Sequence, residues 1–272
     1  MRVKVNEKLI EVEESSTIYC IRDLMVPNCD VTILNGFPIK EDKQLKNGDT
    51  LVFIKKGEMP PKDELETLMM SRHTPGVFNK LKNGVVGVAG LGGLGSNIAI
   101  ALARVGVGKL VLVDFDVVEP SNLNRQQYYI RHIGMKKTEA IKEQLAEINP
   151  FIIVETIDKY LDENNVTEIF SSCEVIIEAF DNPKCKADLV NTILLKTKEK
   201  KIIGNSGMAG LFTSNSIKTR KINSRFYLCG DGENEAKEGS GLMAPRVQIV
   251  AGHAANMAVR LLLGNEEIEN ER

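Results

Sequence analysis

The stretch Gly90-Leu91-Gly92-Gly93-Leu94-Gly95-Ser96 lies between two apolar segments. Residues 85–89 before it have the composition of a buried strand, and residues 98–103 after it have that of a helix. Glycines allow a tight turn whose backbone comes close to a phosphate, and a helix N-terminus offers unpaired N–H groups to an anion. The stretch predicts a strand–turn–helix unit that binds a nucleotide through Gly90, Gly92, Gly93 and Gly95.

A second apolar run, at residues 110–113, ends at Asp114. An acidic residue roughly 20 positions beyond such glycines binds the ribose in dinucleotide-binding folds. An aspartate that follows a strand can also cap the next helix or turn, so position alone leaves both roles open for Asp114.

Composition sets the protein class. The 272 residues allow one large α/β domain of about 200 residues and a small companion. A charged fraction of 26% and a net charge of −2 lack the basic excess of nucleic-acid binders. No apolar stretch approaches the ~20 residues of a membrane span, and the first residues read as a strand and not as a signal peptide. We expect a cytoplasmic protein without a membrane or nucleic-acid partner.

The first 57 residues have the pattern of a ubiquitin-like β-grasp domain. Residues 3–12 predict a β-hairpin, Ser16 or Thr17 can cap a helix, and residues 31–34 and 49–54 predict two more strands. Residues 58–71 then read as a proline-rich linker and a lead-in helix.

Residues 72–272 predict a Rossmann-like, doubly wound, mainly parallel sheet, because strand and helix patterns alternate along them. Residues 230–240 are polar and aperiodic and predict a mobile loop. Beyond the first two strands, we expect strands at residues 152–154, 175–180 and 201–204, and helices at residues 136–148, 189–197 and 245–263.

An ordered set of motifs follows Asp114. It comprises Asp116, Ser121-Asn122-Leu123-Asn124-Arg125-Gln126, Lys137 and Phe180-Asp181-Asn182. Together with the glycine stretch, this set closely resembles the ThiF, MoeB and HesA family, the bacterial relatives of ubiquitin-activating enzymes. The first 57 residues resemble the small sulfur carriers of thiamine and molybdopterin synthesis, most closely those of the ThiS type.

The resemblance implies an enzyme that uses ATP and Mg²⁺ to adenylate the C-terminal Gly-Gly carboxylate of a separate carrier. It implies that Asp114 binds the ribose hydroxyls, with Asp116 beside it. Asn122, Arg125 and Lys137 would bind the phosphates, and Asp181 would bind the metal. Taken singly, these charges could simply lie on solvated faces.

The resemblance also implies a homodimer in which an arginine near the start of the domain reaches the partner's ATP, and Arg72 is the positional candidate. Many relatives hold zinc through two Cys-x-x-Cys pairs. This chain has five dispersed cysteines and only Cys229 near such a position, so we expect no zinc. Cys229 could take part in sulfur transfer, although a buried structural thiol fits a lone cysteine better.

The function predicted on these grounds is adenylylation of a ThiS-like carrier for thiazole synthesis. The N-terminal domain runs from Gly57 into the linker, so it offers no free carboxylate of its own. The alternatives are activation of a molybdopterin carrier, a HesA-like adenylation that modifies tRNA, and a non-catalytic docking module. A nicotinamide oxidoreductase would share the glycine turn, but no Tyr-x-x-x-Lys hydride-transfer site is present.

Overall fold

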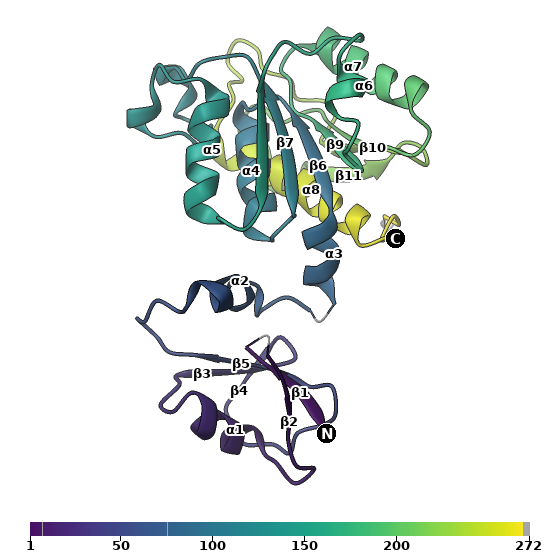
Figure 1. Ribbon diagram of the computed structural model, residues 1–272. Coiled ribbons are helices and arrows are strands. Elements are labelled where there is room, and N and C mark those ends of the chain that lie inside the picture. Colours follow the sequence, from purple (N-terminus) through teal and green to yellow (C-terminus); the bar gives the residue numbers. More distant parts are fainter. Residues whose placement is uncertain (7, 75, 269–272) are drawn as a thin grey trace. The chain divides into compact units, whose positions relative to one another are not determined.

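The computed structural model describes residues 1–6, 8–74 and 76–268, which form two compact units (Figure 1). The first unit is Met1–Asn79 and the second is Lys80–Arg272.

The first unit contains a five-stranded sheet in the order β2-β1-β5-β3-β4. Helix α1 (Ile18–Met25) begins after Thr17, whose hydroxyl accepts a hydrogen bond from Cys20 N as predicted for a cap. Strand β1 pairs antiparallel with β2 and parallel with β5, which confirms the β-grasp prediction. The predicted hairpin turn includes Glu7, which lies outside the described residues. The strands are β1 (Arg2–Val5), β2 (Lys8–Glu11), β3 (Val31–Leu34), β4 (Phe37–Ile39) and β5 (Thr50–Ile54).

Helix α2 (Lys62–Met70) follows Pro61 and confirms the predicted lead-in helix. Its Glu64 carboxylate accepts hydrogen bonds from the Asn6 amide at 3.1 Å and from the Lys8 ammonium at 3.4 Å, so α2 belongs to the first unit. A further helix, α3 (Val77–Asn83), was not predicted.

The second unit contains a seven-stranded sheet in the order β11-β12-β10-β9-β6-β7-β8. All neighbouring pairs are parallel except β11 with β12. The strands are β6 (Val85–Ala89), β7 (Lys109–Asp114), β8 (Ile153–Asp158), β9 (Val175–Glu178), β10 (Lys201–Asn205), β11 (Lys218–Lys221) and β12 (Phe226–Gly230).

Helices cover both faces of this sheet (Figure 1). Helices α4 (Gly93–Arg104), α5 (Lys137–Ile148) and α8 (Ala244–Leu262) pack on one face, and α6 (Val166–Ile169) and α7 (Pro183–Lys196) pack on the other. Three short 3₁₀ helices, η1 (Pro120–Asn122), η2 (Ile130–His132) and η3 (Ser214–Ser216), lie in connections. The doubly wound prediction is confirmed.

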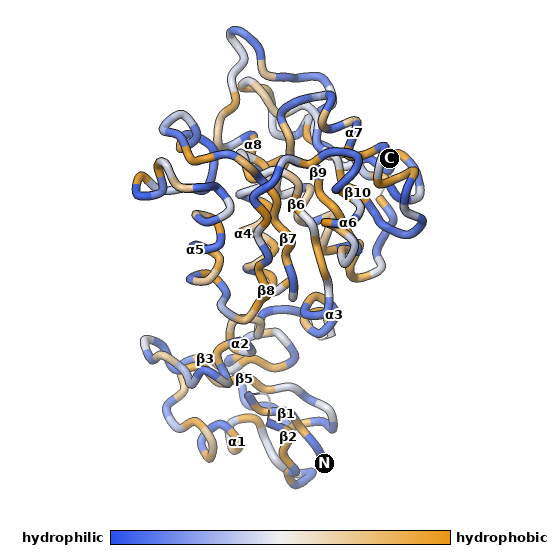
Figure 2. The backbone as a smooth tube through the Cα atoms, turned by 45° about the horizontal axis from the view of Figure 1, so that its top comes forward, coloured by the Kyte–Doolittle hydropathy of each residue, from blue (hydrophilic) through white to orange (hydrophobic). Residues whose placement is uncertain are grey.

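The central strands are apolar because side chains on both of their faces are buried, as Figure 2 shows by the hydrophobic colour along the sheet. Strand β6 has β7 on one side and β9 on the other. The chain winds in opposite directions from β6, and such a switch point leaves a crevice at the carboxyl ends of the strands. The predicted glycine turn lies at that crevice.

The boundaries around Asp181 differ from the prediction. Strand β9 ends at Glu178 instead of residue 180, and α7 begins at Pro183 instead of residue 189. The Asn182 side chain accepts hydrogen bonds from the backbone N–H groups of Lys184 and Cys185, so Asn182 and Pro183 start the helix together. Strands β4 and β11 were also missed, because β4 contains Pro38 and β11 carries three basic residues, so neither shows a strand pattern. Strand β12 was missed although its residues are largely apolar.

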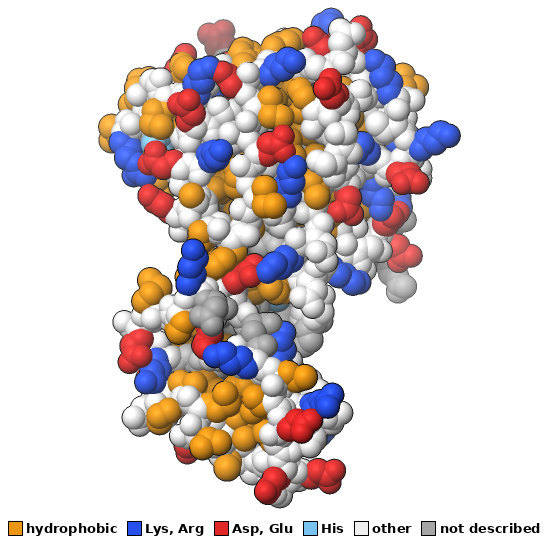
Figure 3. All heavy atoms as spheres, viewed as in Figure 1, with side chains coloured by type: hydrophobic (Ala, Val, Ile, Leu, Met, Phe, Trp, Pro, Cys, Tyr) orange, Lys and Arg blue, Asp and Glu red, His pale blue; other side chains and the backbone are white. Residues whose placement is uncertain are grey.

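Basic and acidic side chains are interspersed over the face of the molecule shown in Figure 3. Within the described part of the chain, no helix combines the length and apolarity needed to cross a bilayer.

Candidate active site

A cavity of about 760 Å³ opens at the carboxyl edge of the second unit's sheet. Eight of the residues singled out in the sequence line it: Gly90, Gly92, Gly93, Asp114, Asp116, Arg125, Lys137 and Asp181. Three others do not. Gly95 lies beneath the turn, Asn122 is engaged in η1, and Arg72 belongs to the first unit.

The glycine turn requires glycine at two positions for different reasons. Gly90 has φ +96°, a left-handed conformation that side chains disfavour, and its N–H donates to Val113 O at 2.8 Å. A Cβ on Gly95 would overlap the carbonyl oxygen of Gly90, so only glycine lets α4 pack this closely against the turn. Gly92 precedes α4, and among the described residues no side chain caps this helix. The first N–H groups of α4 are thus left for a ligand.

Asp114, at the end of β7, is 9% exposed and holds the turn in place. Its Oδ2 accepts from Leu91 N at 2.6 Å and its Oδ1 from Asp116 N at 2.8 Å. The Asp114 carboxylate therefore does cap a turn, which was the structural role left open for it. It also lines the cavity, where its remaining lone pairs can accept further hydrogen bonds.

Lys137, the first residue of α5, is the most buried cation of the cavity wall, with its side chain 7% exposed. Its ammonium donates to Asp116 Oδ2 at 2.7 Å, and its backbone N–H donates to Asp116 O. Asp116 thus fixes the ammonium at the cavity, a role that the sequence did not show.

Arg125 reaches the cavity from the segment after η1. One guanidinium nitrogen donates to two neutral acceptors, Ser121 O at 3.1 Å and Asn124 Oδ1 at 2.8 Å. Asn122 is 8% exposed, and its Oδ1 accepts from Glu119 N at 3.0 Å, so it shapes the segment that carries Arg125.

Asp181 is exposed at the cavity, directly before the cap of α7. No cluster of three or more His, Cys, Asp or Glu side chains in the described residues is placed to hold a metal ion. Magnesium, however, commonly binds through one or two carboxylates together with substrate phosphates and water. The lone Asp181 carboxylate fits such a site.

A buried ion pair beside the cavity was not anticipated. Glu178 ends β9 and is 1% exposed, and its two oxygens accept from the Lys186 ammonium at 2.9 and 3.1 Å. Burial raises the pKa of Glu178, and the Lys186 ammonium opposes that shift. The same ammonium donates to Asn205 O at 3.2 Å, which ties α7 to the end of β10. The signal in the sequence that could have indicated this pair is Glu178 itself, because it is the one charged residue of an otherwise apolar strand.

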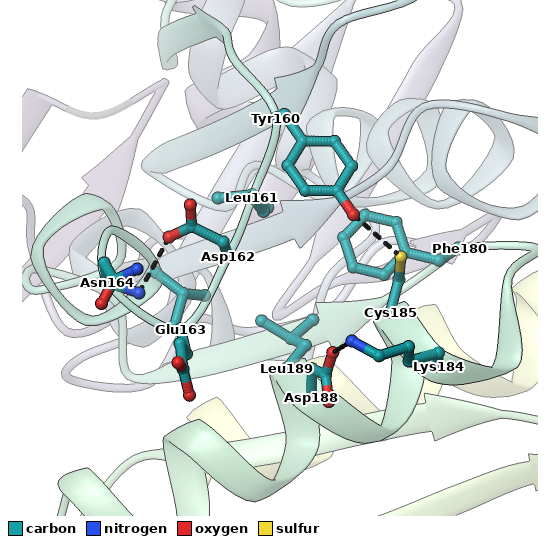
Figure 4. Close-up of a pocket in the computed structure, with 11 residues that line it drawn as sticks. Tyr160, Leu161, Asp162, Glu163, Asn164, Phe180, Lys184, Cys185, Asp188 and Leu189 are labelled. Atoms are coloured by element: carbon teal, nitrogen blue, oxygen red, sulfur yellow. Dashed lines mark hydrogen bonds and ion pairs between the residues drawn. The ribbon is translucent and has the colours of Figure 1, made fainter.

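A smaller cavity of about 320 Å³ adjoins the first, and Tyr160, Leu161, Phe180 and Cys185 line both. Figure 4 shows the Tyr160 hydroxyl pointing at the Cys185 thiol, 3.3 Å from it. Phe180 and Leu161 make this end of the main cavity apolar, in contrast to the end that carries Lys137.

Cys229, considered above for sulfur transfer, lies away from the cavity, and so does His132. Cys229 on β12 is fully buried and its thiol lies 3.5 Å from the Thr219 hydroxyl, and burial raises its pKa to about 11. A protonated, inaccessible thiol fits the structural role. His132 is also fully buried, and its Nδ1 accepts from Tyr129 N.

Comparison with known protein families decides the classification. Residues 66–272 match the ThiF family, and residues 1–57 match the ThiS-like ubiquitin family. The chain belongs to the ThiF family. Membership places it among the E1-like adenylyltransferases, as the motifs indicated.

Named relatives of this ThiF-family chain fall into more than one functional class. The molybdopterin-synthase adenylyltransferase of Salmonella typhimurium is 34% identical over 188 residues, which cover 67% of this chain and 74% of that protein. The tRNA threonylcarbamoyladenosine dehydratase of Haemophilus influenzae is 37% identical over 120 residues, 43% of this chain and 46% of that protein. The E. coli dehydratase solved in complex with ATP shares the fold, with a TM-score of 0.66 and 22% identity over 76% of this chain and 98% of that one.

Proposed function

We propose that this chain transfers AMP from ATP to the C-terminal carboxylate of a separate, ubiquitin-like sulfur carrier that ends in Gly-Gly. The observation that carries the proposal is the convergence on one cavity of a glycine turn, the basic side chains of Arg125 and Lys137, and the carboxylates of Asp114, Asp116 and Asp181. These groups come from separate elements of the sheet edge, and each suits one part of a nucleoside triphosphate.

In this proposal the uncapped start of α4 and the side chains of Arg125 and Lys137 bind the phosphates. Asp114 accepts from the ribose hydroxyls. The adenine then lies toward Phe180 and Tyr160, where the cavity is apolar and aromatic.

The carboxylate oxygen of the carrier attacks the α-phosphorus of ATP, forming an acyl–phosphate bond. The bond to the bridging oxygen between the α- and β-phosphorus atoms breaks, and pyrophosphate leaves with the electron pair. Negative charge builds on the phosphoryl oxygens and on pyrophosphate, so fixed cations lower the barrier. Lys137 is already held by Asp116 and needs little rearrangement to supply such a charge. Asp181 would hold Mg²⁺, which neutralises phosphate charge when bound.

The N-terminal unit favours a carrier of the ThiS type, because its family match is to ThiS-like ubiquitin domains. We therefore propose thiazole synthesis as the pathway. A molybdopterin carrier is the second candidate, since a relative that matches over 74% of its length is a molybdopterin-synthase adenylyltransferase. A tRNA substrate is disfavoured by the net charge of −2 and by the interspersed charges on the face shown in Figure 3, because RNA binding relies on basic surfaces.

We further propose a homodimer in which Arg72 of one subunit reaches the ATP of the other. Mixing an Arg72→Ala chain with a Lys137→Met chain would restore activity, because one site of the mixed dimer would contain both wild-type residues. Absence of recovery in demonstrably mixed dimers contradicts this arrangement.

The transferred group identifies the reaction. Incubation with a Gly-Gly carrier and ATP labelled in the α-phosphate is expected to give labelled carrier, while ATP labelled in the γ-phosphate gives none. Transfer of the γ label would show a kinase, and transfer of neither label to any carrier would contradict the proposal.

A further inference from the structure

One side of the main cavity is built by two segments that contribute no basic residue of their own. Residues 205–208, which begin at the end of β10, and residues 234–236, which follow β12, line this side, and none of them is Lys or Arg. The cations that line the cavity come from other elements, and one of them, Lys186 of α7, reaches this side and donates to Asn205 O at 3.2 Å. With phosphate and ribose placed at β6 and β7, the side at β10 and β12 remains for the group that attacks. Its own segments add no cation, and the Lys186 ammonium is already paired with Glu178, so this side suits the backbone of a peptide C-terminus and not a second polyanion.

Asp231 organises one of the two segments. Its Oδ1 accepts from the backbone N–H groups of Glu233 and Asn234, both at 2.9 Å, and its Oδ2 accepts from the Asn234 side chain at 2.7 Å. Asn234 O in turn accepts from the N–H groups of Met208 and Ala209, both at 3.0 Å. One carboxylate thus holds the turn at residues 231–234, and this turn holds the segment after β10.

Arg246, in the first turns of α8, ties these segments to the body of the unit. Its side chain is 5% exposed and forms an ion pair with the Asp231 carboxylate. The guanidinium also donates to Phe212 O at 2.9 Å, to Thr213 O at 2.8 Å and to the Ser216 hydroxyl at 3.1 Å. This geometry uses the planar fork of arginine, which lysine lacks.

At Gly207, the ion pair of Asp231 and Arg246 packs tightly against the cavity wall formed by residues 205–208 and 234–236. Gly207 has φ +78°, and a Cβ there would overlap Asp231 Oδ1 and the backbone N of Gly232. Removing one partner of a buried ion pair leaves an uncompensated charge, so the wall cannot keep this shape without both groups.

We propose that Asp231 and Arg246 are positioning residues for the acyl substrate: they hold residues 205–208 and 234–236 as the wall along which a peptide C-terminus reaches the α-phosphate. The inference rests on the adenylylation proposed above. Neither residue lines the cavity, and both act through the wall. Their loss therefore affects binding of the carrier and not binding of ATP.

The test measures KM for carrier and for ATP separately, by ATP–pyrophosphate exchange with a purified ThiS-type or MoaD-type carrier ending in Gly-Gly. For Arg246→Met and Asp231→Asn we expect the carrier KM to rise about tenfold, with the ATP KM within about twofold of wild type. Arg246→Lys keeps the charge without the fork and is expected to show most of the same rise. If Arg246→Met does not fold, the carrier KM and the ATP KM of Arg246→Lys are compared with those of wild type in its place.

Lys201→Met is the matched control, because it breaks the ion pair with Glu266 at the opposite end of β10 from the cavity. It is expected to leave both KM values unchanged. An unchanged carrier KM in folded Arg246 and Asp231 variants, or an equal rise in Lys201→Met, overturns the inference while the proposed function stands. Failure of the wild-type chain to exchange with any carrier overturns both.

Discussion

Lys136 and Lys137 are neighbours in the sequence but lie in different surroundings. Lys136 pairs with Asp158 at the surface, with 47% of its side chain exposed, whereas Lys137 is buried at the cavity beside Asp116. Lys137→Met is expected to lower kcat for pyrophosphate exchange by about 100-fold or more, because it removes a fixed charge from the developing phosphate charge. Lys136→Met should stay within about twofold of wild type by the same assay. Equal losses in the two variants would contradict the role given to Lys137.

Two buried thiols predict a dependence of stability on alkaline pH. Burial raises the pKa of Cys173 and of Cys229 to about 11, from an ordinary value of 9.0. Because the folded pKa is the higher one, both thiols contribute their full stability below pH 9.0, and this contribution is lost as pH rises through about 11. Urea unfolding at a series of pH values should show a smaller alkaline loss for Cys229→Ala than for wild type. Parallel pH profiles for the two chains would show that Cys229 is not buried as described.

The pKa of the Asp231 carboxyl is shifted in the opposite direction from the pKa values of the two thiols. Burial alone would raise the pKa of its carboxyl, but hydrogen bonds from Asn234, Glu233 and Arg246 outweigh burial and lower the pKa to about 2. The stability that Asp231 contributes is therefore present above its ordinary pKa and is lost only as pH falls toward 2. The wall next to the cavity is expected to keep its charge pairing throughout the neutral range.

At the scale of elements, the glycine turn and α4 depend on one close contact. Gly95→Ala is expected to destabilise the chain by about 1–3 kcal/mol or more, because its Cβ would overlap Gly90 O. Gly252→Ala is the control: Gly252 lies within α8 and a Cβ there has no neighbour within 4 Å. Alanine at that position should stabilise the helix by up to about 1 kcal/mol. Thermal unfolding tests whether stability falls in Gly95→Ala and rises in Gly252→Ala. A Gly95→Ala protein as stable as wild type would refute this packing.

The elements that sequence patterns predicted well are those with long apolar runs or strong local signals. Residues 85–89 and 110–113 are apolar throughout, and Thr17 and the glycine turn have side-chain and backbone chemistry that fixes a boundary. The start of α7 was missed although Asn182 and Pro183 are typical of a cap and first turn. Strand β11 is polar, and its pairing with β12 at the edge of the sheet, not its sequence pattern, makes it a strand.

The candidate site was predicted in part for a similar reason. Local motifs indicated the glycines, Asp114, Arg125, Lys137 and Asp181, and all of these except Gly95 line the cavity. The buried pairs of Glu178 with Lys186 and of Asp231 with Arg246 join segments that are distant in sequence or lack a motif. Only the fold brings these partners together. Asn122 is the converse case, since its motif suggested a phosphate contact and its side chain accepts from Glu119 N.

At the scale of the whole molecule, the chain joins a carrier-like unit to an activating unit. Gly57 is followed by Glu58 and then by α2, so the N-terminal unit has no terminal carboxylate to activate. The chain alone should therefore not catalyse exchange, and a separate carrier has to supply the carboxylate.

ATP–pyrophosphate exchange by the purified chain, with magnesium and with or without a separate Gly-Gly carrier, tests the central claim most directly. Exchange is expected only when a carrier is present, and a ThiS-type carrier is expected to support it better than a MoaD-type carrier. A preference for the MoaD-type carrier would correct the carrier assignment and leave adenylylation in place. No exchange with either carrier, by a chain shown to be folded, would contradict the proposed function.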